Sequence, residues 1–250
     1  MLLYTPPFQT AYQFLLNDPI AIERLKLKYG HYLLTTDSAA SEACTINCAA
    51  FTNPLSEIDR YVFDHTAYDE SVLALHGGAV EWRGEAYLFL AATTSGKTTL
   101  TSYLTSCGCG YVTDDCILID RSDFCVHPFT TPIQLRDGGL EVLKRYQAVP
   151  EGLALLEEGD TLRRWVYTPE NRVKEELPLK RIFFIERTEH ENAVINMTTT
   201  ERMTALMKSP ITNYTITGDY LRLLSCLAKV ECHVLRYCDM RYVKELIQNG

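Results

Sequence analysis

The sequence lacks a long apolar run and has little glycine, proline and positive charge. No stretch approaches the ~18 continuous apolar residues of a membrane-spanning helix, so we expect no membrane partner. The first residues contain Pro6 and Pro7 and no basic residue before Arg24, a pattern unlike a secretory signal, so we expect a cytoplasmic protein. With 13 glycines and 10 prolines in 250 residues, a fibrous or low-complexity chain is excluded.

Positive charge is in deficit, with 24 basic against 32 acidic residues and a formal net charge of −8. A general nucleic-acid binder needs a basic face, so we expect no nucleic-acid partner. Hydrophobic residues make up 46% and charged residues 22%, which is typical of globular domains. A chain of this length buries roughly 70–75% of its unfolded surface and needs no disulfides for stability.

The nine cysteines form no regular framework. In a reducing compartment they are expected to be free thiols, several of them buried as small apolar side chains. A structural zinc site is the alternative, although no paired C-x₂-C framework supports it. The two groupings to consider are Cys107 and Cys109 with Cys116 and Cys125, or Cys44 with Cys48.

The pattern of apolar residues predicts a small N-terminal subdomain over residues 1–70 and a mixed α/β domain over residues 71–250. The first contains a helix over Pro19–Lys28 and short apolar runs at His31–Leu34 and Cys44–Phe51. Residues 150–178 are polar and are expected to form a long surface excursion. In the second domain we expect strands at Ser71–Val80, Glu85–Ala91, Tyr111–Asp115, Cys116–Asp120, Arg181–Glu186 and Cys232–Tyr237, and helices at Lys97–Cys107, Asp137–Tyr146, Thr198–Ser209, Gly218–Lys229 and Asp239–Gln248.

Residues 91–98 read Ala-Ala-Thr-Thr-Ser-Gly-Lys-Thr and match the phosphate-binding pattern G-x-x-x-x-G-K-[ST] except at Ala91. A strand precedes the loop and a helix follows it, so backbone N–H groups and the helix dipole can bind phosphate. Lys97 can reach the β- and γ-phosphates of ATP, and the Thr98 hydroxyl can ligate Mg²⁺. Alanine at the first position requires a loop that begins with a negative φ. The nucleotide-binding residues are expected to be Thr93, Thr94, Ser95, Gly96, Lys97, Thr98 and Thr99.

Asp114 and Asp115 follow Lys97 by only 17 and 18 residues. One short helix and a Gly-Cys-Gly turn fill that interval, so the next strand can return near the loop. One carboxylate can then hold the metal while the other takes a proton from an attacking hydroxyl. The alternative is an ordinary turn, in which aspartate is common.

Other candidates have both a functional and a structural interpretation. His76 precedes Gly77 and Gly78 on a strand that can lie next to the phosphate-loop strand. The glycines permit close backbone approach, and the imidazole is either an acid–base group or a structural hydrogen-bonding residue.

Phosphoryl transfer needs positive charge near the transition state. Arg136 and the pair Arg163 and Arg164 can supply it, or they can be surface arginines.

Together these segments resemble the catalytic domain of the HPr kinase/phosphorylase family, whose fold is similar to phosphoenolpyruvate carboxykinase. The resemblance implies proton transfer by His76 and Asp114, ATP–Mg²⁺ binding by Lys97 and Thr98, and a metal-side role for Asp115. The matching segments are Leu75–Val80, Gly96–Thr98 and Gly110–Asp115, with weaker similarity over Pro128–Arg136, Leu179–Arg187 and the C-terminal strand and helix.

The resemblance favours an ATP-dependent kinase that phosphorylates a Ser or Thr hydroxyl of a peptide or protein. The chain looks more like a divergent branch of the family, some members of which phosphorylate precursor peptides. Acidic residues of the 150–178 excursion, Glu157, Glu158 and Asp160, can attract a basic peptide. The alternative is a non-catalytic nucleotide-binding sensor or partner protein, and a homo-oligomer is compatible with either.

Overall fold

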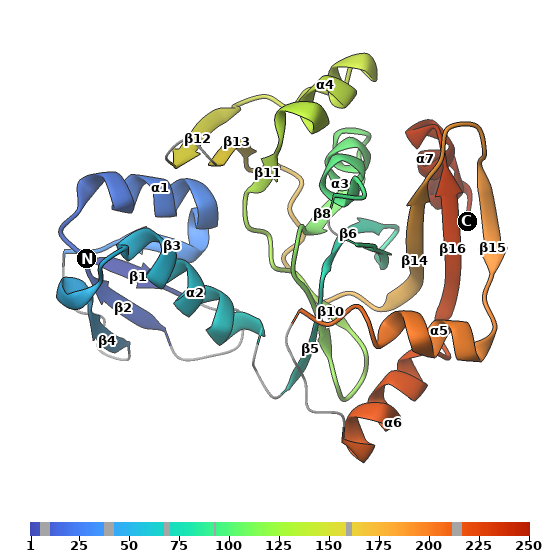
Figure 1. Cartoon of the computed structure of the whole chain (residues 1–250), viewed down its shortest axis with the longest axis horizontal. Coiled ribbons are helices and arrows are strands. Elements are labelled where there is room, and N and C mark those ends of the chain that lie inside the picture. Colours follow the sequence, from blue (N-terminus) through green and yellow to red (C-terminus); the bar gives the residue numbers. More distant parts are fainter. Residues whose placement is uncertain (6–10, 38–42, 68–70, 93, 159–161, 212–216) are drawn as a thin grey trace.

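The computed structural model describes residues 1–5, 11–37, 43–67, 71–92, 94–158, 162–211 and 217–250. Figure 1 shows a smaller N-terminal part beside a larger part built on a central sheet. The chain is mixed α/β, as predicted. None of the described helices is long and apolar enough to span a membrane.

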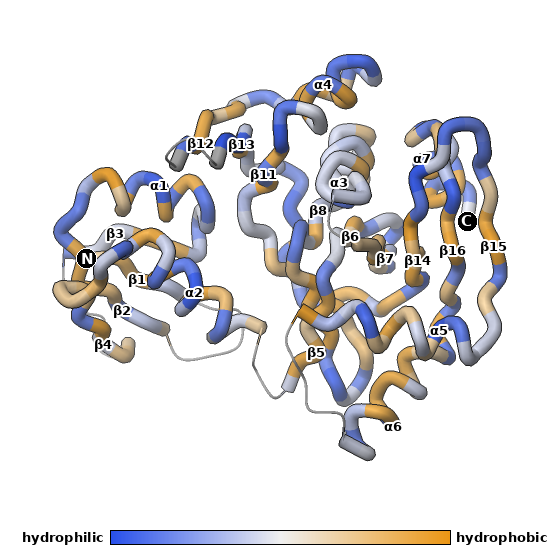
Figure 2. The backbone as a smooth tube through the Cα atoms, viewed as in Figure 1, coloured by the Kyte–Doolittle hydropathy of each residue, from blue (hydrophilic) through white to orange (hydrophobic). Residues whose placement is uncertain are grey.

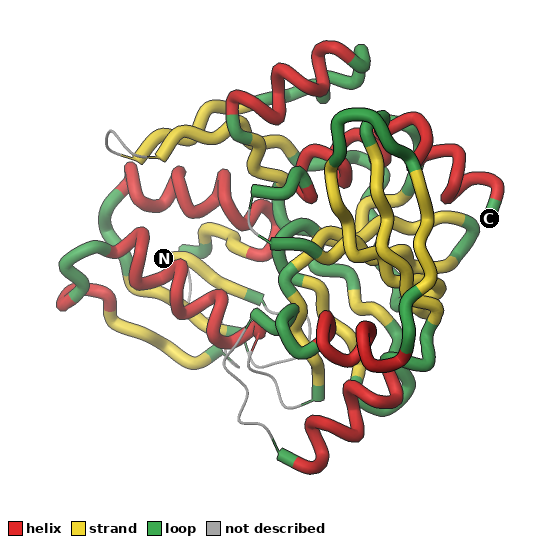
Figure 3. Tube along the Cα trace, turned by 45° about the vertical axis from the view of Figure 1, so that its right-hand side comes forward, coloured by secondary structure: helices red, strands yellow, loops and turns green. Residues whose placement is uncertain are grey.

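The N-terminal part is a four-stranded sheet in the order β3-β1-β2-β4, with two helices packed on it. Its buried residues, such as Phe14, Leu25 and Val62, form a hydrophobic core of their own. Figure 3 shows α1 and α2 next to each other against these strands. The elements are β1 (Leu2–Tyr4), β2 (Tyr12–Leu15), α1 (Pro19–Tyr29), the 3₁₀ turn η1 (Gly30–Tyr32), β3 (Leu33–Thr35), β4 (Cys44–Asn47), the 3₁₀ turn η2 (Cys48–Ala50) and α2 (Pro54–Ala67).

The central sheet has six strands in the order β15-β16-β14-β7-β6-β8. Strands β7, β14 and β16 are parallel, whereas β6, β8 and β15 join their neighbours antiparallel. The strands are β6 (Gly77–Trp82), β7 (Glu85–Leu90), β8 (Gly110–Thr113), β14 (Leu179–Arg187), β15 (Ala193–Asn196) and β16 (Glu231–Tyr237).

Residues on the two faces of this sheet enter two different cores because side chains alternate along a strand. In β7, Tyr87 and Phe89 pack with the helices α3 (Lys97–Ser106), α4 (Asp137–Arg145) and α7 (Met240–Asn249). Ala86, Leu88 and Leu90 face the opposite core, which includes α5 (Thr199–Leu206) and α6 (Gly218–Leu227). Figure 2 shows the hydrophobic residues concentrated in the strands between these helices.

The predicted strand over Ser71–Val80 is two strands in two sheets, separated at His76. β5 (Val72–Leu75) pairs with β9 (Ile117–Asp120), which also pairs with β10 (Val126–His127), whereas β6 belongs to the central sheet. The His76 N–H donates to the carbonyl of Ser209 instead of to either sheet. The apolar run is continuous because both strands are buried, so hydrophobicity alone does not reveal the break.

The predicted excursion over 150–178 contains a β-hairpin. β12 (Ala154–Glu158) and β13 (Leu162–Tyr167) pair with each other, and β13 also pairs with β11 (Ile133–Leu135). Alternation in β13 places Val166 in the interior and leaves Arg163 exposed. The polar surface of the hairpin therefore explains why the segment resembles a loop in sequence.

The predicted helices are present within one to three residues at their ends. Local chemistry fixes their starts: Thr198 and Glu201 form the expected capping box of α5, and the Asp239 carboxylate accepts the N–H of Arg241 at the start of α7. These interactions satisfy N–H groups that have no partner inside the helix.

Candidate functional site

The sheet topology brings the candidate residues together at one edge of the central sheet, where β7 and β14 have their carboxyl ends. The phosphate loop follows the carboxyl end of β7, and Arg187 ends the parallel strand β14. β6 runs antiparallel to β7, with Gly77 opposite Leu90, so His76 lies at the same edge. β8 runs antiparallel to β6, so Asp114 and Asp115 also emerge there. β6 separates the aspartate strand from the loop strand, and the site spans all three.

The phosphate loop has the backbone geometry that its sequence requires. Ala91 does not adopt a positive φ, whereas Gly96 has φ 90° and is the N-cap of α3 without a side-chain cap. The first turn of α3 therefore keeps N–H groups for an anion. Thr94 has φ 69°, an unfavourable conformation for a β-branched residue that costs about 1–3 kcal/mol. Thr93 lies outside the described residues.

Lys97 is folded back onto its own loop. The side chain is only 5% exposed, and its Nζ donates to the carbonyl oxygens of Ala91 and Ala92, both at 3.0 Å. Burial lowers the pKa of Lys97, against the opposing effect of Asp115 and Asp114. In this conformation the Lys97 ammonium is held by two carbonyl groups of its own loop.

Asp114 lies beneath the surface of the site. It is 5% exposed and hydrogen-bonds with the Thr98 side chain. Burial, followed by repulsion from Asp115, raises its pKa well above the usual range. Its Oδ1 atom is buried with no hydrogen-bond partner among the described residues, an arrangement that is costly unless a ligand or cation completes it.

Asp115 is exposed and turns the chain from the central sheet into the β5–β9 sheet, with φ 72°. The His76 Nδ1 lies 3.2 Å from the Asp115 carbonyl oxygen. A carbonyl can only accept, so His76 carries its proton on Nδ1. Burial, and then Lys97, lower the pKa of His76, which leaves Nε2 unprotonated near neutral pH. His76 thus holds the backbone of Asp115 in an unusual conformation.

The two glycines after His76 permit the close approach expected from the sequence. A Cβ at Gly78 would overlap the Thr101 hydroxyl of α3 and lie 3.6 Å from Asp114 Oδ1. A Cβ at Gly77 would lie 2.6 Å from the carbonyl oxygen of Phe89. Their absence of side chains lets α3 and Asp114 pack directly on β6.

The site opens into a cleft with two lobes that share His76, Asp115 and Arg136. The loop lobe has a volume of about 600 Å³, and its lining includes Thr94, Gly96, Lys97, Thr98 and Thr99 from the loop and α3, together with Lys28, Arg164 and Arg187. The apolar lobe has a volume of about 960 Å³ and is lined mainly by apolar residues, including Phe63, Phe184 and Ile211, together with Lys208.

The structure separates the arginine candidates. Arg136 lines both lobes and Arg164 lines the loop lobe. Burial, and then Arg136, lower the pKa of Arg164. Arg163 points to the other side of β13, where it lies 5.6 Å over the ring of Trp165 and 3.8 Å from Asp137. The sequence predicts a polar excursion here and no strand; the alternation of side chains along β13 explains the difference.

Three further lining residues have no signal in the sequence. Lys28 is near the end of α1 and Phe63 lies on α2, both in the N-terminal part, and Arg187 ends β14. Only the packing of the N-terminal part against the central domain brings the first two to the cleft. In the sequence Lys28 is an ordinary surface lysine near the end of a helix. In the structure its Nζ lies 2.5 Å from Asp59 Oδ2.

The remaining candidates lie elsewhere. The nine cysteines are free thiols, and among the residues that the structure describes no group of three or more His, Cys, Asp and Glu side chains is placed to hold a metal ion. Neither cysteine grouping is part of such a group. Glu157 lies 4.0 Å from Arg163 and lines neither lobe. Asp160 and the side chain of Glu158 lie outside the described part.

Comparison with models of protein families finds none that matches this chain, and comparison with curated proteins finds no match in sequence. Among solved structures, the Hpr(Ser) kinase/phosphatase from Coxiella burnetii aligns with 70% of this chain and 94% of its own, at 8% identity and a TM-score of 0.35. A likeness at this level assigns neither a family nor an activity, so function has to be inferred from the residues of the cleft.

Proposed function

We propose that the chain is an ATP-dependent phosphotransferase that moves the γ-phosphoryl group to a Ser or Thr hydroxyl of a peptide or protein. The observation that carries the proposal is the meeting of His76, Asp115 and Arg136 at the junction of the loop lobe and the apolar lobe. We assign the loop lobe to the phosphoryl donor and the apolar lobe to the acceptor, and call them the donor lobe and the acceptor lobe. A transferase needs a donor site and an acceptor site that share the reacting centre.

The donor lobe is suited to a polyphosphate. Five basic side chains line it, namely Lys28, Lys97, Arg136, Arg164 and Arg187, against the single carboxylate of Asp115. This local excess contrasts with the net charge of −8 for the whole chain. Cations concentrated in a cleft attract anionic substrates and stabilise charge that develops on a transferring phosphoryl group.

The residues around Thr98 fit Mg²⁺. A magnesium ion in a nucleotide site uses one or two carboxylates together with substrate phosphates. Asp114 presents a buried oxygen that has no partner in the described part of the chain, and it hydrogen-bonds with the Thr98 side chain. When bound, the ion neutralises charge on the β- and γ-phosphates. We therefore assign Thr98 and Asp114 to the metal side.

Asp115 is assigned to the acceptor side. Its exposed carboxylate belongs to both lobes, whereas Asp114 lines neither. In the proposed step the acceptor oxygen forms a bond to the γ-phosphorus, the bond to the β–γ bridging oxygen breaks, and ADP leaves. Asp115 takes the hydroxyl proton, and His76 positions the Asp115 backbone through its Nδ1–H bond. This division of labour is the reverse of the one implied by the family resemblance.

The direct test is transfer of labelled γ-phosphoryl from ATP to a library of peptides that contain Ser or Thr. Wild type should label acceptors in the presence of Mg²⁺, and Lys97→Ala should not. If the protein binds ATP but neither labels any acceptor nor releases ADP, the alternative applies, and the chain is a nucleotide-binding sensor without catalysis.

A further inference from the structure

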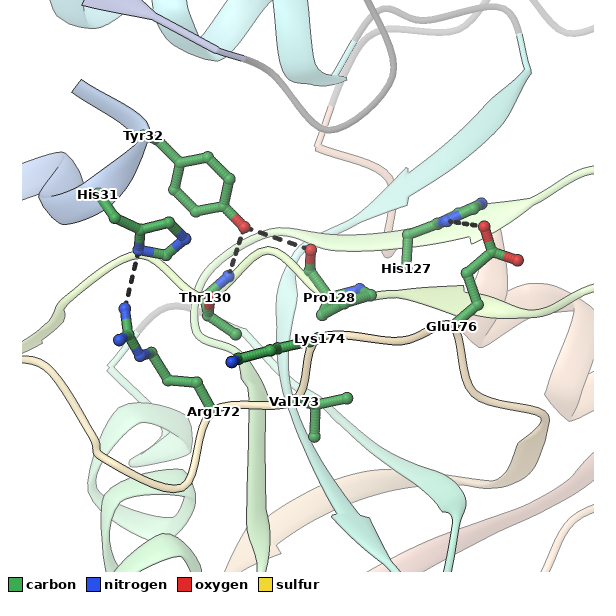
Figure 4. Close-up of a pocket in the computed structure, with 9 residues that line it drawn as sticks. All are labelled: His31, Tyr32, His127, Pro128, Thr130, Arg172, Val173, Lys174 and Glu176. Carbon is green, nitrogen blue, oxygen red and sulfur yellow. Dashed lines mark hydrogen bonds and ion pairs between the residues drawn. The ribbon is translucent and has the colours of Figure 1, made fainter. Parts of the chain in front are cut away.

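A second cavity lies away from the cleft, between the N-terminal part and the central domain. It has a volume of about 520 Å³, within the range of small-molecule sites, and we call it the seam cavity. None of its lining residues was a candidate in the sequence. Figure 4 shows that polar side chains from three separate segments converge there: His31, Tyr32, His127, Arg172, Lys174 and Glu176.

One end of the seam cavity is a cluster of hydrogen-bond donors. Arg172 donates to His31 Nδ1 at 2.9 Å, and because a guanidinium cannot accept, His31 must be neutral with its proton on Nε2. Burial and the nearby Arg172 lower the pKa of His31, in agreement with that state. Lys174 extends beside Arg172 (Figure 4), and no ion-pair partner of either is found in the described residues.

The opposite end carries negative charge. His127 is buried, with Nδ1 3.1 Å from Glu176 Oε1 and Nε2 3.5 Å from Asp120 Oδ2. The Glu176 side chain is 57% exposed. A carboxylate has about four lone-pair sites, so its contact with His127 leaves capacity for a donor from a ligand.

The floor between the two ends is fixed. The Tyr32 hydroxyl accepts the Thr130 N–H at 3.1 Å and donates to the Pro128 carbonyl at 3.4 Å. The Tyr32 ring packs 4.9 Å from the ring of Phe129. These contacts tie η1 to the segment before β11, so the cavity is held open by ordered elements on both sides.

We propose that the seam cavity binds a small organic molecule with an anionic oxygen group at one end and an amino group at the other. The carboxylate or phosphate of the ligand contacts Arg172, Lys174 and the His31 Nε2–H. Its amino group contacts Glu176. A ligand with only an anion satisfies half of the cavity and leaves the remaining acceptor capacity of Glu176 unused.

The test uses 6-aminohexanoate as the probe, with hexanoate and hexylamine as matched compounds that each lack one charged end. Saturation-transfer NMR and calorimetry on the full chain should show saturable binding of 6-aminohexanoate, about tenfold tighter than either matched compound, since each end forms a charge-assisted hydrogen bond. Equal binding of 6-aminohexanoate and hexanoate, or no saturable binding of 6-aminohexanoate, would overturn the proposal.

Variants locate the site. Lys174→Gln, an exposed side chain whose loss should not affect folding, should weaken 6-aminohexanoate by about tenfold or more, and Glu176→Gln should weaken it while leaving hexanoate unchanged. Lys229→Gln is the matched surface control. Binding should persist in Lys97→Ala, which alters the cleft alone. Loss of binding in Lys97→Ala with retention in Lys174→Gln would place the probe in the cleft and contradict the assignment.

Discussion

The cleft and the seam cavity share two segments of the chain in their linings but differ in charge. Lys28 lines the donor lobe, and His31, three residues later, lines the seam cavity. Thr130 lines the seam cavity and Arg136 lines the cleft. The donor lobe has five basic groups and one carboxylate, whereas the seam cavity combines two basic groups, Arg172 and Lys174, with the acidic Glu176. Short stretches of sequence thus build two environments that suit different ligands.

The difference shows why net charge is a poor guide to a particular site. A total of −8 disfavours a polyanion partner over the whole surface, yet the cleft collects cations from α1, α3, β13, β14 and the residue before α4. These residues are far apart in sequence. Only the fold brings them together, and the field that a substrate meets is the local one.

The largest contrast between the two regions is expected from their lysines. Lys97→Ala should weaken ATP–Mg²⁺ binding by about 10–100-fold, the effect of losing a charge-assisted contact, and should abolish transfer. Lys174→Ala in the seam cavity should change ATP affinity by less than about twofold, as an exposed charge distant from the phosphates. Calorimetry with ATP measures both. Equal ATP affinity of wild type and Lys97→Ala would remove the basis for a nucleotide site.

A smaller contrast separates two neighbouring arginines on β13. Arg164→Gln removes a cation from the donor lobe and should slow single-turnover transfer by about tenfold or more. Arg163→Gln removes exposed contacts with Asp137, Glu157 and the Trp165 ring and should change the rate by less than about twofold. The two variants alter charge and size equally, so equal effects on the rate would contradict the orientation of the strand.

The smallest expected effect concerns one histidine from each region. Burial lowers the pKa of His76 and of His31 below the ordinary value of 6.5. At these two sites the unfolded chain binds more protons than the folded one, so the two histidines should make the free energy of unfolding fall as pH decreases below about 6.5. Each histidine contributes at most about 1.4 kcal/mol per pH unit, and less because both rings are partly exposed.

His76→Gln and His31→Gln should each reduce this slope, and the double variant should reduce it further. Urea unfolding at a series of pH values from 7.5 down to 5 measures it, with His190→Gln, a fully solvated histidine, as the control. A slope that is the same in wild type and in the double variant would show that neither ring is held neutral by the fold.

Much of the central domain could be predicted because its local signals agree with its tertiary structure. The loop between β7 and α3, the Gly108 that ends α3 with φ 97°, and the capping box at Thr198 each act within a few residues. The placement of Lys97 and the aspartates at one edge followed from the short connection between them.

Other features depend on contacts that are distant in sequence. The break at His76 exists because β5 pairs with β9 while β6 pairs with β7, and no local residue pattern distinguishes the two partners. The hairpin of β12 and β13 carries polar residues on its exposed face and therefore resembles a loop. Lys28 and Phe63 line the cleft because the N-terminal part packs against the rest of the chain. The sequence pattern of a single helix does not predict that packing.

We propose that Asp115 serves the acceptor and that Asp114 serves the metal. Single-turnover transfer across a Mg²⁺ titration tests it with two isosteric variants. Asp115→Asn should lower the rate by about 10²–10⁴-fold at every Mg²⁺ concentration, with an unchanged Mg²⁺ requirement and intact ATP binding. Asp114→Asn should raise the Mg²⁺ requirement, and excess Mg²⁺ should restore part of the rate. The reverse pattern, or an equal shift of the Mg²⁺ requirement in both variants, would contradict the account.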